Sequence, residues 1–109
     1  MTPIRPVEFQ ILLTLAGEER HGYGIMQEAA RLSGGEMQIE AGTLYRALHR
    51  MLKAGWVAES GRRPVADLDD ERRKYYLLTP LGRRIASAEA ERLARLVGAA
   101  RANRLLTRA

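Results

Sequence analysis

The sequence predicts a mainly α-helical domain with one small β-hairpin, extended by a long C-terminal helix. Three segments in the first half of the chain repeat apolar residues at helical spacing, and two short strand-like runs follow them. Thr79 and Pro80 then begin a last helix that continues to about residue 106. The chain has 109 residues, which suits one compact domain. We expect residues 1–79 to form this domain and residues 80–109 to form the C-terminal helix.

The first two helices are expected over residues 7–17 and 22–32. Pro6 suits a first helical turn, where no amide donor is needed, and Gly17 can end the first helix. The apolar repeat of the first helix consists of Phe9, Leu12, Leu13 and Ala16. Gly34 and Gly35 together form a strong stop signal after the second helix.

The third helix is expected over residues 41–54, and Gly55 is placed to cap its C-terminal end. Its inward-facing side chains are Leu44, Leu48, Met51 and Leu52. Residues 37–40, just before it, alternate apolar and polar side chains. That pattern fits either a brief strand or an extended turn.

Residues 57–60 and 74–78 are expected to pair as a β-hairpin. The 12 residues between them, 61–72, include glycine, proline and seven charged side chains, which is typical of an exposed loop. Three helices, a hairpin and a long last helix follow one another in the order of a winged helix-turn-helix. In that arrangement the second and third helices form the helix-turn-helix and the hairpin forms the wing.

The last helix carries an apolar stripe longer than so small a domain can cover by itself. The stripe consists of Leu81, Ile85, Ala88, Leu93, Leu96, Val97 and Ala100. Because an exposed apolar stripe on a long helix usually packs against another helix, we expect a two-fold homodimer. The alternative is a helix that folds back on its own domain, with dimerisation elsewhere.

The outward face of the third helix is the leading candidate for a nucleic-acid contact. It carries Thr43, Arg46, His49, Arg50 and Lys53, with Tyr45 at its edge. An ordinary solvated helix face usually carries mixed charges, but residues 41–54 contain no acid. Arg and Lys side chains on such a helix can contact guanine edges or phosphates in a major groove. Gly42, near the helix start, lets the backbone amides approach a phosphate.

The two ends of the wing are also basic. Its candidate DNA contacts are Arg62, Arg63, Arg72, Arg73 and Lys74. Four acids lie between them, within residues 67–71, so either the whole wing or only one end of it contacts DNA. Tyr23 is a further candidate for a phosphate contact. His21 lacks metal-ligand spacing to any partner, and we expect it to start the second helix.

The net charge of +5 does not by itself identify the DNA-binding segment. Residues 1–79 carry 11 basic and 11 acidic side chains, whereas residues 80–109 carry seven arginines and two glutamates. With no cysteine, the chain has no disulfide framework and no thiolate metal site. We find no phosphate-binding glycine loop, nucleophile turn or other catalytic constellation, and expect neither an enzyme nor a cofactor. The short apolar runs exclude a membrane span. Residues 1–20 carry no signal-peptide pattern and the lack of cysteine suits a reducing compartment, so we expect a cytoplasmic protein.

Three segments together resemble the PadR family of bacterial transcriptional regulators. They are HGYGIMQEA at 21–29, GTLYRALHRMLKAGWV at 42–57 and DDERRKYYLLTPLGRR at 69–84. The resemblance implies a winged helix-turn-helix repressor that dimerises through its C-terminal helix. It also implies that Thr43 and Tyr45 contact the DNA backbone and that the basic residues before Tyr75 serve the wing.

The chain departs from this family in two places. Many members have proline where this chain has Arg46, so we interpret Arg46 as an additional base-reading residue. Some small relatives bind flat drugs between aromatic residues at the dimer interface, but residues 80–109 contain no aromatic residue. We therefore expect Trp56 in the core, and the sequence identifies no small-molecule effector.

The leading hypothesis is a sequence-specific repressor that binds double-stranded DNA at a palindromic operator as a homodimer. The alternative is a winged-helix module that binds another protein, with DNA binding secondary to that role.

Overall fold

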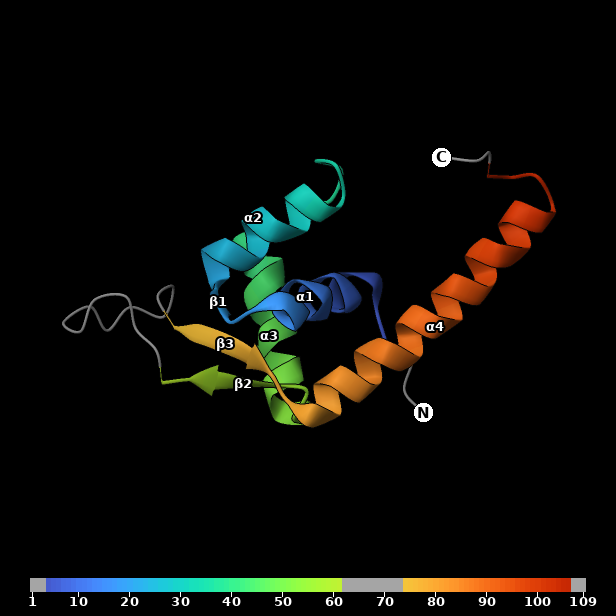
Figure 1. Cartoon of the computed structure of the whole chain (residues 1–109). Coiled ribbons are helices and arrows are strands. Elements are labelled where there is room, and N and C mark those ends of the chain that lie inside the picture. The colour runs from blue at the N-terminus through green and yellow to red at the C-terminus, as the bar shows by residue number, and fades with distance from the viewer. Residues whose placement is uncertain (1–3, 62–73, 107–109) are drawn as a thin grey trace.

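The structure, a computed structural model, describes residues 4–61 and 74–106 (Figure 1). Its elements are α1 (Pro6–Gly17), β1 (Arg20–His21), α2 (Gly22–Leu32), α3 (Ala41–Ala54), β2 (Val57–Ser60), β3 (Tyr75–Leu78) and α4 (Pro80–Ala102). The expected fold class, mainly α with a small hairpin, is confirmed. Some boundaries differ: α1 begins at Pro6, α4 ends at Ala102 instead of near residue 106, and Lys74 precedes its strand. The strand β1 was not expected, and of the two alternatives for residues 37–40 the strand does not form.

The hydrophobic core lies between α1, α2 and α3 and is closed by the small sheet. Its largest fully buried apolar side chains are Ile11, Leu12, Ile25, Leu44, Leu48, Met51 and Val57. Three of the four inward residues expected for α3 are therefore buried, and Leu52 is half-buried against them. Trp56 packs against the same cluster, as expected.

The apolar face expected for α1 needs correction. Its core face consists of Ile11, Leu12 and Leu15, which are buried. Leu13 and Ala16 are exposed and point away from this core. The error arises because α1 is apolar on two sides, and the spacing of apolar residues cannot show which side meets the core.

The sheet has three antiparallel strands in the order β1-β3-β2. In the hairpin, Glu59 pairs with Tyr76 and Ser60 with Tyr75. On the other edge of β3, His21 pairs with Tyr75. The two residues of β1 lie between α1 and α2, so this pairing ties the start of α2 to the base of the wing.

The start of α4 is fastened to the turn that follows α3. The Thr79 hydroxyl lies 2.6 Å from the Gly55 carbonyl oxygen and accepts a hydrogen bond from the Gly82 amide at 3.0 Å. The Thr79 amide donates to the Trp56 carbonyl oxygen at 3.1 Å. Thr79 therefore acts as the expected N-cap of α4 and also sets the direction in which this helix leaves the domain.

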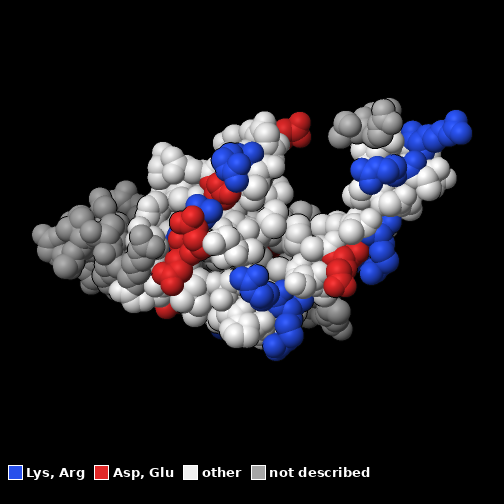
Figure 2. Space-filling model, viewed as in Figure 1, with Lys and Arg blue, Asp and Glu red and all other residues white. Residues whose placement is uncertain are grey.

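The outer half of α4 extends away from the helical body, on the side opposite the wing (Figure 1). The described chain is accordingly elongated, with extents of 55 × 30 × 22 Å. On the face seen in Figure 2, acidic and basic side chains alternate over the body, whereas beyond Glu91 α4 shows only basic and uncharged surface. The first turns of α4 pack onto the helical body. The expected division into a DNA-binding domain, residues 1–79, and a dimerisation helix, residues 80–109, stays a prediction.

Candidate DNA-binding surface

The outward face of α3 is exposed along its length. Arg46, His49 and Lys53 are exposed, and Thr43 is half-buried near the helix start. The helix ends at Gly55, whose backbone is left-handed with φ of 81°, a conformation that glycine adopts without strain. Two cationic side chains and one imidazole of the same helix, those of Arg46, Lys53 and His49, are therefore in contact with solvent.

Arg46 folds back toward the first turn of α3. Its Nη2 lies 3.4 Å from the Thr43 hydroxyl, a long contact. A side chain at Gly42 would approach the Arg46 Nη1 to 3.3 Å, so the glycine leaves room for this guanidinium. Three of the predicted DNA-contact residues are thus neighbours in space: Gly42, Thr43 and Arg46.

An open hollow of about 720 Å³ lies between α3 and β3. Its lining includes Gly42, Arg46, His49 and Arg50 from α3 and Tyr76 from β3. The hollow brings side chains of α3 next to Tyr76 of the hairpin. The rest of its lining is Tyr45, Leu48 and Leu52, so the two arginines stand at the edge of a largely apolar surface.

The Tyr45 side chain on α3 packs against the start of α2. It is half-buried, and a side chain at Gly22 would overlap the Tyr45 hydroxyl. The close approach explains why glycine occupies the first position of α2. The Tyr45 ring thus has a packing role besides the DNA-backbone contact that the family resemblance implies.

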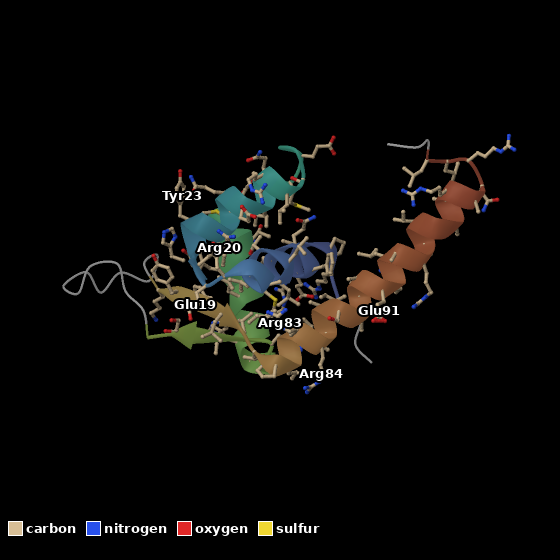
Figure 3. All side chains as sticks on the ribbon, in the orientation of Figure 1. Glu19, Arg20, Tyr23, Arg83, Arg84 and Glu91 are labelled. Carbon is tan, nitrogen blue, oxygen red and sulfur yellow. The ribbon has the colours of Figure 1, made fainter. Side chains whose placement is uncertain are left out.

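His21 has the structural role expected for it. Its Nδ1 accepts a hydrogen bond from the Gly24 amide at 2.9 Å, which makes it the N-cap of α2. Its ring meets the Tyr75 ring edge-on, with centroids 5.2 Å apart. Tyr23, two residues on, is 60% exposed and projects outward from the start of α2 (Figure 3).

Only one of the five predicted wing cations is described. Lys74 lies 3.7 Å from Glu59 on the neighbouring strand, so its ammonium already has an acidic neighbour. The other four, Arg62, Arg63, Arg72 and Arg73, lie outside the described residues. Their proposed DNA contacts stay predictions.

Two other arginines are neutralised within their own helices. The hydrogen bond from Arg31 lowers the pKa of the Glu28 carboxyl on α2. On α4, the hydrogen bond from Arg92 lowers the pKa of Glu89 in the same way. Both carboxylates are therefore charged near neutral pH and offset the charge of the neighbouring arginine.

The contact made by Arg50 was not predicted from the sequence. Its Nε lies 3.2 Å from the Oε2 atom of Glu8, a buried acid in the first turn of α1. The acid stands at the third helical position, where glutamate often accepts from the preceding backbone, and that signal was present in the sequence. Nothing in the spacing of 42 residues indicated its pairing with α3.

A model of the Transcriptional regulator PadR-like family matches residues 11–88 of the chain. The chain belongs to this family. The match includes α2, α3, the wing and the first part of α4. Membership of the PadR-like family identifies the protein as a transcriptional regulator and not an enzyme.

Solved structures share the PadR-like fold. A transcriptional regulator from Clostridium thermocellum superposes with a TM-score of 0.71 at 24% identity, covering 93% of this chain and 90% of that one. A PadR family regulator from Clostridium difficile gives the same score and identity over 93% and 98%. Bacillus subtilis PadR in complex with operator DNA gives 0.66 at 22%, over 79% of this chain and 47% of that chain.

A curated relative from Lysinibacillus sphaericus, described as an uncharacterized protein, is 36% identical over 73 residues. The match spans 67% of this chain and 64% of that protein. None of the helices in the described part of the PadR-like chain combines the length and apolar character of a membrane span.

Proposed function

We propose that this protein is a sequence-specific repressor that acts in the cytoplasm and binds a palindromic operator as a homodimer. The observation that carries the proposal is the exposed, acid-free face of α3, with Arg46, His49 and Lys53. A B-form major groove accepts an α-helix, and these side chain types read base edges or bind phosphates there. Bacillus subtilis PadR, solved in complex with operator DNA, supports DNA as the ligand of this fold.

The remaining contacts divide between the helix-turn-helix and the wing. Thr43, Tyr45 and Arg50 are assigned to the DNA backbone, and Gly42 admits the phosphate near the start of α3. Tyr23 is assigned to a phosphate contact, and the exposure of its side chain supports that assignment. The wing cations Arg62, Arg63, Arg72, Arg73 and Lys74 are assigned to the backbone or minor groove beside the recognition helix.

The exposed apolar side chains of α4 support a homodimer. Leu96 is 55% exposed and Val97 42% exposed in the isolated chain, while Leu93 and Ala100 continue the same stripe. Among the inner residues of the predicted stripe, Ile85 packs on the core of its own chain. Leu81 and Ala88 are exposed. The dimerising segment we propose is the outer half of α4, because this half extends away from the body of its own chain (Figure 1).

A small groove between α1 and α4 is large enough to take one apolar side chain from a second copy. It has a volume of about 140 Å³, and its lining includes Phe9, Leu13, Leu78, Ala86 and Ala90. The exposed side of α1 that does not meet the core thus faces α4. Two-fold pairing through these surfaces would carry two copies of α3 to successive major grooves, roughly 34 Å apart.

Selection of bound fragments from the host genome, followed by a salt titration on a labelled fragment, tests the proposal. We expect a fragment from the promoter region of a regulated gene to be enriched. Its affinity should fall steeply with salt, because several Lys and Arg contacts release counterions from the phosphates. If no fragment is preferred over random DNA, the repressor assignment is wrong and a protein-binding winged-helix module becomes the better description.

A further inference from the structure

Glu8 and Arg50 form an ion pair between α1 and the recognition helix, and the two members differ in exposure. Arg50 Nε lies 3.2 Å from Glu8 Oε2. The Glu8 side chain is only 7% exposed, whereas the Arg50 side chain is 41% exposed. The carboxylate therefore belongs to the interior of the domain, and the guanidinium reaches from it to the outer surface.

The position of the carboxylate is set by its own helix. Glu8 Oε1 accepts a hydrogen bond from the Arg5 amide at 2.9 Å, at the start of α1. Both carboxylate oxygens are therefore in use, one for the backbone of α1 and the other for Arg50. A buried charge without a partner is strongly destabilising, so the pair holds Arg50 in place as much as it compensates Glu8.

Only the inner nitrogen of Arg50 is used in this pair. In the part of the chain that the structure describes, no residue hydrogen-bonds to its two terminal nitrogens. Arg50 also lines the hollow between α3 and β3, together with Arg46 and His49. Because a guanidinium is planar and rigid, fixing Nε also fixes the direction of the terminal nitrogens. Their fork geometry matches a phosphate.

We propose that Glu8 is a positioning residue for DNA binding, which holds Arg50 by Nε so that its terminal nitrogens meet a backbone phosphate. The inference rests on the proposed function of the chain as a DNA-binding regulator. Its physical benefit is that the long side chain of Arg50 is ordered when the protein folds, so binding does not incur that entropy cost. A lysine at position 50 could serve the acid or the phosphate but not both, because its charge sits on one nitrogen.

The test uses the full-length protein and the DNA duplex that it enriches most from a random-sequence library. Affinity is measured by fluorescence anisotropy at several salt concentrations, and the melting temperature of each variant is recorded separately. The variants are Glu8→Gln, Arg50→Lys and the double mutant. Arg5 and Arg50 use different oxygens of Glu8, and glutamine replaces one of these oxygens with an NH2 donor, which cannot accept the second hydrogen bond.

Glu89→Gln on α4 is the matched control. It removes the same charge and also weakens a Glu–Arg pair, with Arg92 Nη2 at 2.6 Å from Glu89 Oε2, both on α4. Any general gain in DNA attraction on losing one acid will appear in this control. Relative to it, we expect Glu8→Gln to weaken binding about two- to tenfold, through the lost ordering of Arg50.

The decisive measurement is whether the effects of the Glu8 and Arg50 substitutions on DNA affinity are additive. If Glu8 acts through Arg50, Glu8→Gln will cause no further loss once Arg50→Lys is present. Additive losses, or a Glu8→Gln variant that binds like Glu89→Gln, would overturn the proposal. A purely structural Glu8 would lower the melting temperature and leave the affinity of the folded protein unchanged, which would also overturn it.

Two further outcomes separate this inference from the proposed function. If no duplex is enriched, the DNA-binding assignment itself fails, and the role of Glu8 fails with it. If a duplex is enriched but the variants act additively, only the inference fails. Should Glu8→Gln not fold, Glu8→Asp takes its place, because it keeps the charge but is one methylene too short to reach both donors.

Discussion

The backbone of Gly82, in the first turn of α4, lies directly against the carbonyl oxygen of Trp56, and no side chain fits between them. A Cβ atom at this position would overlap that oxygen. The contact is rigid on both sides, since the Trp56 carbonyl also accepts the Thr79 amide. The direction of the proposed dimerisation helix therefore depends on a glycine contact with the turn after α3.

We expect Gly82→Ala to destabilise the protein by about 1–3 kcal/mol, because overpacking against a backbone atom forces α4 to shift. Urea unfolding followed by circular dichroism measures the change. Gly98→Ala is the control, since Gly98 lies in the same helix and a Cβ atom there would have no neighbour within 4 Å among the described residues. We expect that control to stabilise the helix by roughly 0.5–1 kcal/mol. Equal effects of the two changes would argue against the Trp56 contact.

The N-cap of α2 gives a second prediction. His21→Ala removes the acceptor for the Gly24 amide, and we expect a loss of about 1 kcal/mol in the free energy of unfolding. His21→Asn loses the ring contact with Tyr75 but keeps a capping oxygen, so it should restore much of that loss. Thermal unfolding of the three proteins compares them. If Asn is no better than Ala, the contribution of His21 comes from its ring and not from the cap.

Arg46 and Lys53 should differ in how they act on DNA. If Arg46 reads a base, Arg46→Ala should cost about 1–3 kcal/mol in binding and relax the preference at one position of the operator. Lys53→Ala should weaken binding to all sequences alike, with a shallower salt slope. Competition binding against a panel of single-base operator variants distinguishes the two. The recognition-helix assignment would be wrong if both variants bound like the parent.

The homodimer can be tested on the outer half of α4. Leu93→Glu combined with Leu96→Glu places two charges on the exposed apolar stripe, and we expect monomers by light scattering. Gly98→Glu combined with Ala102→Glu adds the same charge on the opposite side of the helix and should leave the dimer intact. A Leu93/Leu96 variant that remains dimeric would move the interface to another surface.

The sequence was sufficient for the architecture because the local signals agreed with one another. The apolar repeat of α3, the Gly55 cap and the Thr79–Pro80 start each predicted the element that the structure contains. Where local signals conflicted, prediction failed. α1 is apolar on two sides, so its spacing pointed to Leu13 and Ala16, although the core takes Ile11 and Leu15.

The two-residue strand β1 had no signal of its own, because Arg20 and His21 have neither the length nor the alternation of a strand. Pairing with β3 creates that strand, and such pairing depends on where α1 and α2 place the segment. The same reason applies to the His21 ring, whose partner Tyr75 is distant in the sequence.

Neighbouring residues were enough to establish the helices, the hairpin, the acid-free face of α3 and the apolar stripe of α4, since each depends on positions a few residues apart. How these residues are used follows from the tertiary structure. In the folded chain, Arg50 binds the buried Glu8. Tyr45 packs against Gly22, and the backbone of Gly82 contacts the Trp56 carbonyl oxygen. These contacts join separate elements of the fold, and packing between elements leaves no periodic pattern in a single sequence.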